Sequence, residues 1–106
     1  MTNSNEKGKR GERELAKWLR DNFNVFAKRG QQHSGSPDSP DVVADIPGIH
    51  LEVKRVEKLN LHTAMEQAKR DCGDNVPVVC HRRNRSEWLV TVPAGFFFSL
   101  LMVDDI

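Results

Sequence analysis

Three residues of the chain have the types and spacing to bind a divalent cation beside a phosphate group. Asp41 is followed by Glu52 and Lys54 in a stretch rich in Val and Ile. Two neighbouring carboxylates supply the oxygen ligands that a hard cation such as Mg²⁺ prefers, with other positions left to water and phosphate. An ammonium group beside them could hold an attacking water or neutralise charge that develops on the phosphate. A solvated face with weak ion pairs is the alternative, because Glu-x-Lys is common on exposed strands.

A predicted β-hairpin brings these residues together. Residues 42–46 and 49–54 form two β-rich runs, and Pro47-Gly48 between them suits a tight turn. A two-residue loop predicts the cross-strand pairs Ile46–Ile49, Ala44–Leu51, Val43–Glu52 and Asp41–Lys54.

Side-chain alternation along the two runs predicts one apolar and one polar face. The apolar face, which is expected to point inward, comprises Val42, Ala44, Ile46, Ile49, Leu51 and Val53. The other face comprises Asp41, Val43, Asp45, His50, Glu52 and Lys54. A one-residue slip of either strand would turn its charges toward the core, so the agreement of both strands supports this arrangement.

The order of these motifs resembles that of the PD-(D/E)xK nucleases. Pro40-Asp41 followed by Glu52-Val53-Lys54 is similar to the motif of that superfamily, and the surrounding residues resemble the Holliday junction resolvases of archaea and phages. Residues 7–15 resemble the first helix of those resolvases, and the resemblance extends over residues 7–93. A second Pro-Asp pair occurs at Pro37-Asp38, but only Asp41 leads into the strand that faces Glu52.

The resemblance implies a metal site. Asp41, Glu52 and the main-chain carbonyl of Val53 would hold Mg²⁺, with Mn²⁺ as the expected substitute. Glu12, in the first helix, would add a ligand or position a metal-bound water.

The resemblance also implies catalytic roles for Lys54 and Gln67. Lys54 would assist the attacking water and stabilise charge on the phosphate, while Gln67 would orient the water or Lys54. A surface position for Gln67 is the alternative. The expected catalytic residues are therefore Glu12, Asp41, Glu52, Lys54 and Gln67.

Basic residues are unevenly distributed, although the formal net charge is only +1. The first third of the chain carries Lys7, Lys9, Arg10, Arg13, Lys17, Arg20, Lys28 and Arg29. Such a patch is the electrostatic signature of a polyanion partner, and a charged solvated helix is the alternative. The expected DNA-binding residues are Lys7, Lys9, Arg10, Arg29, Ser34, Ser39, Arg82 and Arg83, with either Ser34 or Ser39 as the serine implied by the resemblance. Arg82 and Arg83 belong to a turn that could instead be an ordinary solvated tip.

The remaining pattern predicts an α/β domain with a restriction-endonuclease-like core, a central mixed β-sheet flanked by helices in the order α-β-β-β-α-β-β-α. Helices are expected at residues 8–22, 61–72 and 93–102, with Asn60 capping the second. Further strands are expected at residues 24–29, 76–82 and 88–92. Residues 1–6 are expected to be disordered, and residues 30–40 to form a loop that closes over DNA or is simply a flexible connector. The chain of 106 residues is expected to be one domain.

Several classes of protein are disfavoured. Cys72 and Cys80 lack the spacing of a zinc site. The sequence also lacks a glycine-rich phosphate loop, so no nucleotide cofactor is expected. The longest apolar run, near residues 96–103, is too short to span a bilayer, so a cytoplasmic location is expected, in the host cytosol if the protein is encoded by a phage. The surplus apolar side chains of this run predict either a homodimer interface or completion of a small core.

The expected function is that of a structure-selective, Mg²⁺-dependent endodeoxyribonuclease that cleaves branched DNA, above all four-way junctions. The alternatives are a nuclease of the same superfamily acting on flaps, nicks or duplex DNA, and a noncatalytic DNA-binding module. A subunit interaction domain built on residues 96–102 is a third alternative.

Overall fold

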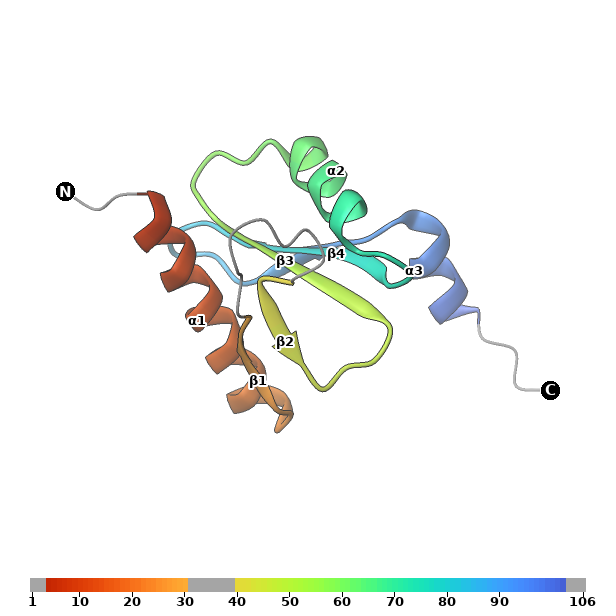
Figure 1. Cartoon of the computed structure of the whole chain (residues 1–106), viewed down its shortest axis with the longest axis horizontal. Coiled ribbons are helices and arrows are strands. Elements are labelled where there is room, and N and C mark those ends of the chain that lie inside the picture. Colours follow the sequence, from red (N-terminus) through yellow and green to blue (C-terminus); the bar gives the residue numbers. More distant parts are fainter. Residues whose placement is uncertain (1–3, 31–39, 103–106) are drawn as a thin grey trace.

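The computed structural model describes residues 4–30 and 40–102. They form a five-stranded mixed sheet in the order β1-β2-β3-β4-β5, with helices packed against it (Figure 1). The elements are α1 (Ser4–Phe23), β1 (Ala27–Arg29), β2 (Val42–Ala44), β3 (Ile49–Arg55), α2 (Leu61–Asp71), β4 (Val76–Arg82), β5 (Leu89–Thr91) and α3 (Ala94–Leu101). Strands β3 and β4 are parallel, and the other neighbouring strands are antiparallel. The predicted element order and mixed sheet are confirmed.

A local signal accounts for the start of α2. Asn60 caps α2, and its side-chain oxygen accepts a hydrogen bond from the Thr63 amide at 3.1 Å, as predicted. Helix α1 begins at Ser4, before the expected start at residue 8.

The sheet is covered on both faces, each by a different helix. Leu15, Ala16 and Leu19 of α1 pack on one face, in a cluster that includes Leu51 and Val53 of β3. On the other face, α2 contributes the buried residues Ala64 and Ala68, which pack with Val79 of β4. Glu52 is paired with Val79 in the parallel β3–β4 ladder, so it lies on the α2 side of the sheet. The predicted polar face of β3 is thus largely enclosed rather than open to solvent.

Helix α3 is apolar but contributes no buried residue. It lies at the opposite end of the molecule from α1 in Figure 1. An apolar cavity of about 480 Å³ extends between α1, the sheet and α3. Its lining residues include Trp18, Trp88, Val90, Phe97 and Leu100.

None of the helices in the described part of the chain is both long and apolar enough to cross a bilayer.

Candidate active site

The register of the β2–β3 hairpin brings Asp41 closer to Glu52 than the sequence predicted. Val42, rather than Ala44, is the partner of Leu51. The predicted two-residue loop is therefore wrong, because β2 ends at Ala44 and a longer turn precedes Ile49. The strand is displaced by an even number of residues, so each side chain keeps the face predicted for it. The displacement places Asp41 near Glu52 instead of opposite Lys54.

Backbone contacts fix the position of Asp41 just before β2. Its amide donates to the Leu51 carbonyl at 2.9 Å, and its Oδ2 accepts a hydrogen bond from the Val53 amide at 2.8 Å. The Gly30 amide donates to the Asp41 carbonyl at 2.8 Å. A Cβ atom at Gly30 would lie 2.1 Å from the Pro40 carbonyl oxygen, so only glycine permits this close approach.

Glu52 is a buried carboxyl group in the middle of β3, with only 1% of its surface exposed. Its Oε1 lies 2.8 Å from Nε2 of His50, whereas Oε2 is buried without a hydrogen-bond donor among the described residues. Burial raises the pKa of Glu52 to about 8, with further contributions from the charge of Asp41 and from a hydrogen bond between the two carboxyl groups. The Asp41 and Glu52 carboxyl groups are therefore close enough to share a proton. When both are ionised, Glu52 Oε2 has no hydrogen-bond donor among the described residues.

Lys54 extends from the same face of β3 to α2. Its Nζ donates to Oε1 of Gln67 at 3.0 Å. Its charge also lowers the pKa of Glu52, although burial and Asp41 outweigh this effect. Lys54 and Gln67, which are far apart in the sequence, thus meet beside the buried carboxylates.

Glu12 of α1 approaches the site from the other face of the sheet and is paired with Arg29. Arg29 Nε lies 2.8 Å from Glu12 Oε1. Burial and the charge of Asp41 raise the pKa of Glu12, and the Arg29 guanidinium partly opposes this effect. Arg29, which was expected to contact DNA, therefore also neutralises a carboxylate at the edge of the site.

The donor set fits a divalent cation held by two carboxylates. In residues 4–30 and 40–102, no group of three or more His, Cys, Asp or Glu side chains is arranged to hold a metal ion. The observation in favour of a metal is the buried Glu52 Oε2, which lies beside the Asp41 carboxyl group and, when both groups are ionised, has no donor among the described residues. Leaving such an oxygen unpaired costs on the order of 1–3 kcal/mol. A hard cation would satisfy Oε2, and water and phosphate can supply its remaining ligands.

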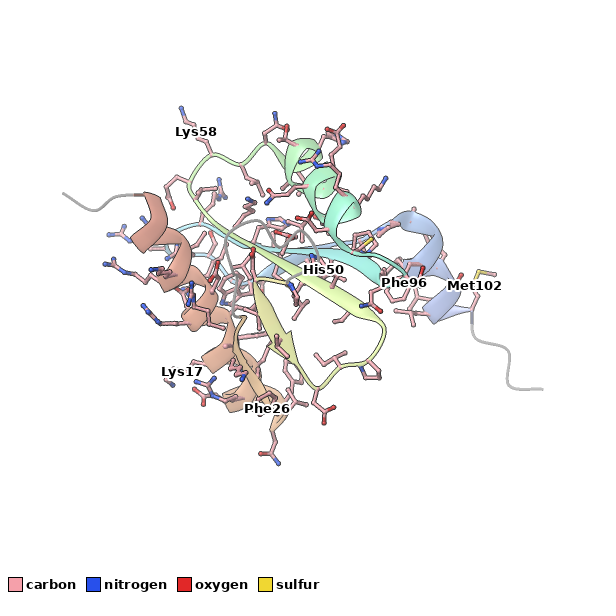
Figure 2. The ribbon with its side chains drawn as sticks, viewed as in Figure 1. Lys17, Phe26, His50, Lys58, Phe96 and Met102 are labelled. Carbon is pink, nitrogen blue, oxygen red and sulfur yellow. The ribbon has the colours of Figure 1, made fainter. Side chains whose placement is uncertain are left out.

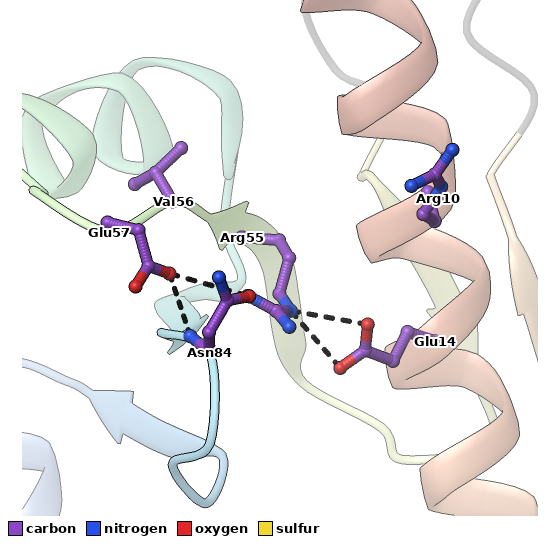
Figure 3. A pocket seen from close by; sticks show the side chains of 6 residues that line it. All are labelled: Arg10, Glu14, Arg55, Val56, Glu57 and Asn84. Atoms are coloured by element: carbon purple, nitrogen blue, oxygen red, sulfur yellow. Dashed lines mark hydrogen bonds and ion pairs between the residues drawn. The ribbon is translucent and has the colours of Figure 1, made fainter. Parts of the chain in front are cut away.

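The residues expected to bind DNA occupy different surroundings. Arg10 is exposed and lines a cavity of about 280 Å³ together with Glu14, Arg55, Glu57 and Asn84 (Figure 3). Arg55 is paired with both Glu14 and Glu57, so much of the charge in this cavity is already neutralised.

The other expected DNA-binding residues are more dispersed. Arg82 is paired with Glu14, and its Nε donates to the Ser86 carbonyl at 2.6 Å. Arg83 is exposed in the turn after β4, and Lys9 is half-buried on α1. Lys7 also lies in α1, whereas Ser34 and Ser39 are outside the described residues.

His50 was not among the residues expected in the site. His50 was placed on the face of Glu52, and a spacing of two residues along a strand was the available signal. Its contact with Glu52 was not anticipated. The contacts of Glu14 with Arg55 and Arg82 also had no sequence signal, because they join residues from three distant segments.

Comparisons with known proteins identify relatives of the chain. The family model described as "Phage putative PDDEXK endonuclease" matches residues 3–104. The solved structure of Hjc, a Holliday junction resolvase from the archaeal hyperthermophile Archaeoglobus fulgidus, is similar to this chain, with a TM-score of 0.52 and 26% sequence identity. The similarity covers 81% of this chain and 72% of that one. No curated protein matches the chain.

Proposed function

The chain belongs to the phage PDDEXK endonuclease family, and from this membership and the geometry of the site we propose that it is a structure-selective endodeoxyribonuclease that cleaves branched DNA. Four-way junctions are the proposed substrate, and cation-dependent hydrolysis of a phosphodiester bond is the proposed reaction. The similarity to a solved Holliday junction resolvase supports the substrate. The observation that supports the chemistry is the buried pair Asp41 and Glu52 next to Lys54, in which Glu52 Oε2 has no hydrogen-bond partner among the described residues.

Asp41 and Glu52 would hold Mg²⁺, or Mn²⁺ in its place, with the main-chain carbonyl of Val53 as a further ligand. When bound, the cation would lower the pKa of a coordinated water and help to neutralise the phosphate. Glu12 would add a ligand or hold a metal-bound water if its ion pair with Arg29 breaks.

Lys54 provides a positive charge that does not depend on the cation. Gln67 accepts a hydrogen bond from its ammonium group at 3.0 Å, which restricts the long side chain. A positioned ammonium group stabilises negative charge that develops on a phosphate during hydrolysis. Lys54 is therefore assigned to the phosphate and the attacking water, and Gln67 to the orientation of Lys54.

The basic residues of α1 and its surroundings would contact the DNA backbone. Exposed Arg10 and Arg83 are available for phosphates, and Lys9 and Arg29 lie in part at the surface. Such contacts fix the position of DNA but read no base sequence, which suits an enzyme that selects a branched structure.

A homodimer is part of the proposal, because a four-way junction presents two symmetric strands for cleavage. The exposed apolar helix α3 supports this assembly. Its exposed side chains, with those of neighbouring residues, are Phe97, Phe98, Leu100, Leu101 and Met102.

Cleavage assays with a labelled four-way junction, a flap, a nicked duplex and a linear duplex in Mg²⁺ test the proposal. The wild type is expected to cut the junction and to leave the linear duplex intact. Asp41→Asn and Lys54→Ala are expected to bind the junction but to cut it at least about 10²-fold more slowly. Asp74→Asn, which changes an exposed carboxylate outside the site, is the matched control.

Two outcomes would contradict the proposal. A wild type that binds the junction in Mg²⁺ or Mn²⁺ without cutting it would be a noncatalytic DNA-binding module. Preferential cutting of the flap, nick or linear duplex would keep the chemistry but replace the proposed substrate.

A further inference from the structure

His50 is a fully buried histidine in β3, the strand that also carries Glu52. It lies two residues before Glu52 in β3 and is 2% exposed. Figure 2 shows it in the interior of the molecule, beside the central strands. Buried polar groups require hydrogen-bond partners, and Nε2 of His50 is 2.8 Å from Oε1 of Glu52.

The hydrogen bond gives the Glu52 carboxylate a defined orientation. The terminal torsion of a glutamate is soft, so without a fixed partner the two oxygens can exchange positions easily. Glu52 binds a cation in its ionised form, in which both oxygens only accept, so in that state the hydrogen of this contact is assigned to Nε2 of His50. With Oε1 held by His50, Oε2 is the oxygen left without a donor among the described residues.

Asp41 is held in a comparable way from the backbone. Its Oδ2 accepts from the Val53 amide at 2.8 Å, and Val53 follows Glu52 directly. One oxygen of each carboxyl group is thus fixed by a donor within β3. The strand therefore orients both groups before any cation binds.

We propose that His50 is a positioning residue, which donates from Nε2 to Glu52 Oε1 and thereby directs Oε2 toward the cation. This inference rests on the proposed function, since it assumes that Asp41 and Glu52 bind a divalent metal. Groups that orient a metal ligand commonly change metal affinity or activity by 10–100-fold when they are removed.

Titration of metal-free protein with Mn²⁺ alone, followed by calorimetry, tests the inference without DNA. His50→Leu removes the donor and is expected to weaken Mn²⁺ binding by about 10–100-fold. His50→Gln places an amide N–H at a reach similar to that of Nε2 and is expected to restore most of the affinity. His62→Leu, at an exposed position on α2, is the matched control and should bind as the wild type does.

Cleavage kinetics provide a second readout. His50 is buried and bonded to Glu52, so His50→Leu should lower kcat while KM for the junction stays unchanged. His50→Gln should recover kcat. If circular dichroism shows that His50→Leu does not fold, His50→Asn takes its place, because its shorter amide does not reach Oε1.

The results separate this inference from the proposed function. Wild-type Mn²⁺ affinity in His50→Leu, or an equal loss in His50→Gln, would overturn the positioning role while the nuclease proposal stands. If the wild type itself neither binds Mn²⁺ nor cuts DNA, the proposed function fails and this inference fails with it.

Discussion

A buried Glu52 makes the stability of the metal-free protein depend on pH. Burial is the main cause that raises its pKa in the folded state to about 8, from the ordinary value of 4.5 for a glutamate. Between these values the folded state binds more protons than the unfolded state does, so stability falls as pH rises. This contribution is fully present below about pH 4.5 and is lost as pH passes about 8.

Urea unfolding in chelator measures this effect. The free energy of unfolding should decrease with rising pH, with a slope for this group of at most about 1.4 kcal/mol per pH unit. Glu52→Gln should remove that part of the slope, whereas Glu66→Gln, at an exposed position on α2, should retain it. Identical slopes in the wild type and Glu52→Gln would contradict the assignment.

The Lys54–Gln67 contact predicts coupled effects on cleavage. Gln67→Leu removes the acceptor at 3.0 Å from the ammonium and should lower kcat/KM about tenfold, in keeping with a hydrogen bond to a charged group. Gln67→Glu keeps an acceptor and should lose less. A double-mutant cycle with Lys54→Ala should be non-additive, because Gln67 acts through Lys54. Additive losses would show that Gln67 acts independently.

At the scale of elements, the close approach of α1 to β3 depends on Gly11. A Cβ atom at this position would lie 2.6 Å from the Cβ of Arg55. Gly11→Ala should therefore destabilise the protein by about 1–3 kcal/mol through overpacking, despite the better helix propensity of alanine. Because Glu12 is the next residue, cleavage should decrease as well.

Gly8→Ala is the matched control within α1. A Cβ atom at Gly8 meets nothing within 4 Å, so this change should stabilise the protein by about 0.5–1 kcal/mol. Urea denaturation of both variants measures the difference. Equal stabilisation by both substitutions would mean that α1 does not pack against β3 at this point.

At the scale of the whole molecule, the exposed apolar surface of α3 predicts self-association. Leu101 is 65% exposed, so Leu101→Asp should leave the fold intact but weaken the proposed dimer, as measured by sedimentation equilibrium. Phe26→Asp is the matched control, because Phe26 is 58% exposed and lies far from Phe96 and Met102 in Figure 2. A monomeric wild type, or equal weakening by both changes, would contradict this interface.

Local patterns in the chain were sufficient to predict most of the architecture. Alternation with a period of two identified the inward face of β3, and Asn60 marked the start of α2, because both signals act over a few residues. The order of the Asp41, Glu52 and Lys54 motifs also predicted the superfamily and its restriction-endonuclease-like fold, and both are confirmed by the comparisons. The roles of the individual site residues remain predictions.

Tertiary packing determined the features of the site that the sequence did not predict. The β2–β3 register, the contact of His50 with Glu52 beneath α2, and the pairing of Arg29 with Glu12 were not predicted. The amino-acid sequence determined which groups are present and which face of a strand each one occupies. Only the folded structure determined which polar side chains are buried and which protein groups replace the water around them. Burial and long-range pairing depend on how distant segments pack.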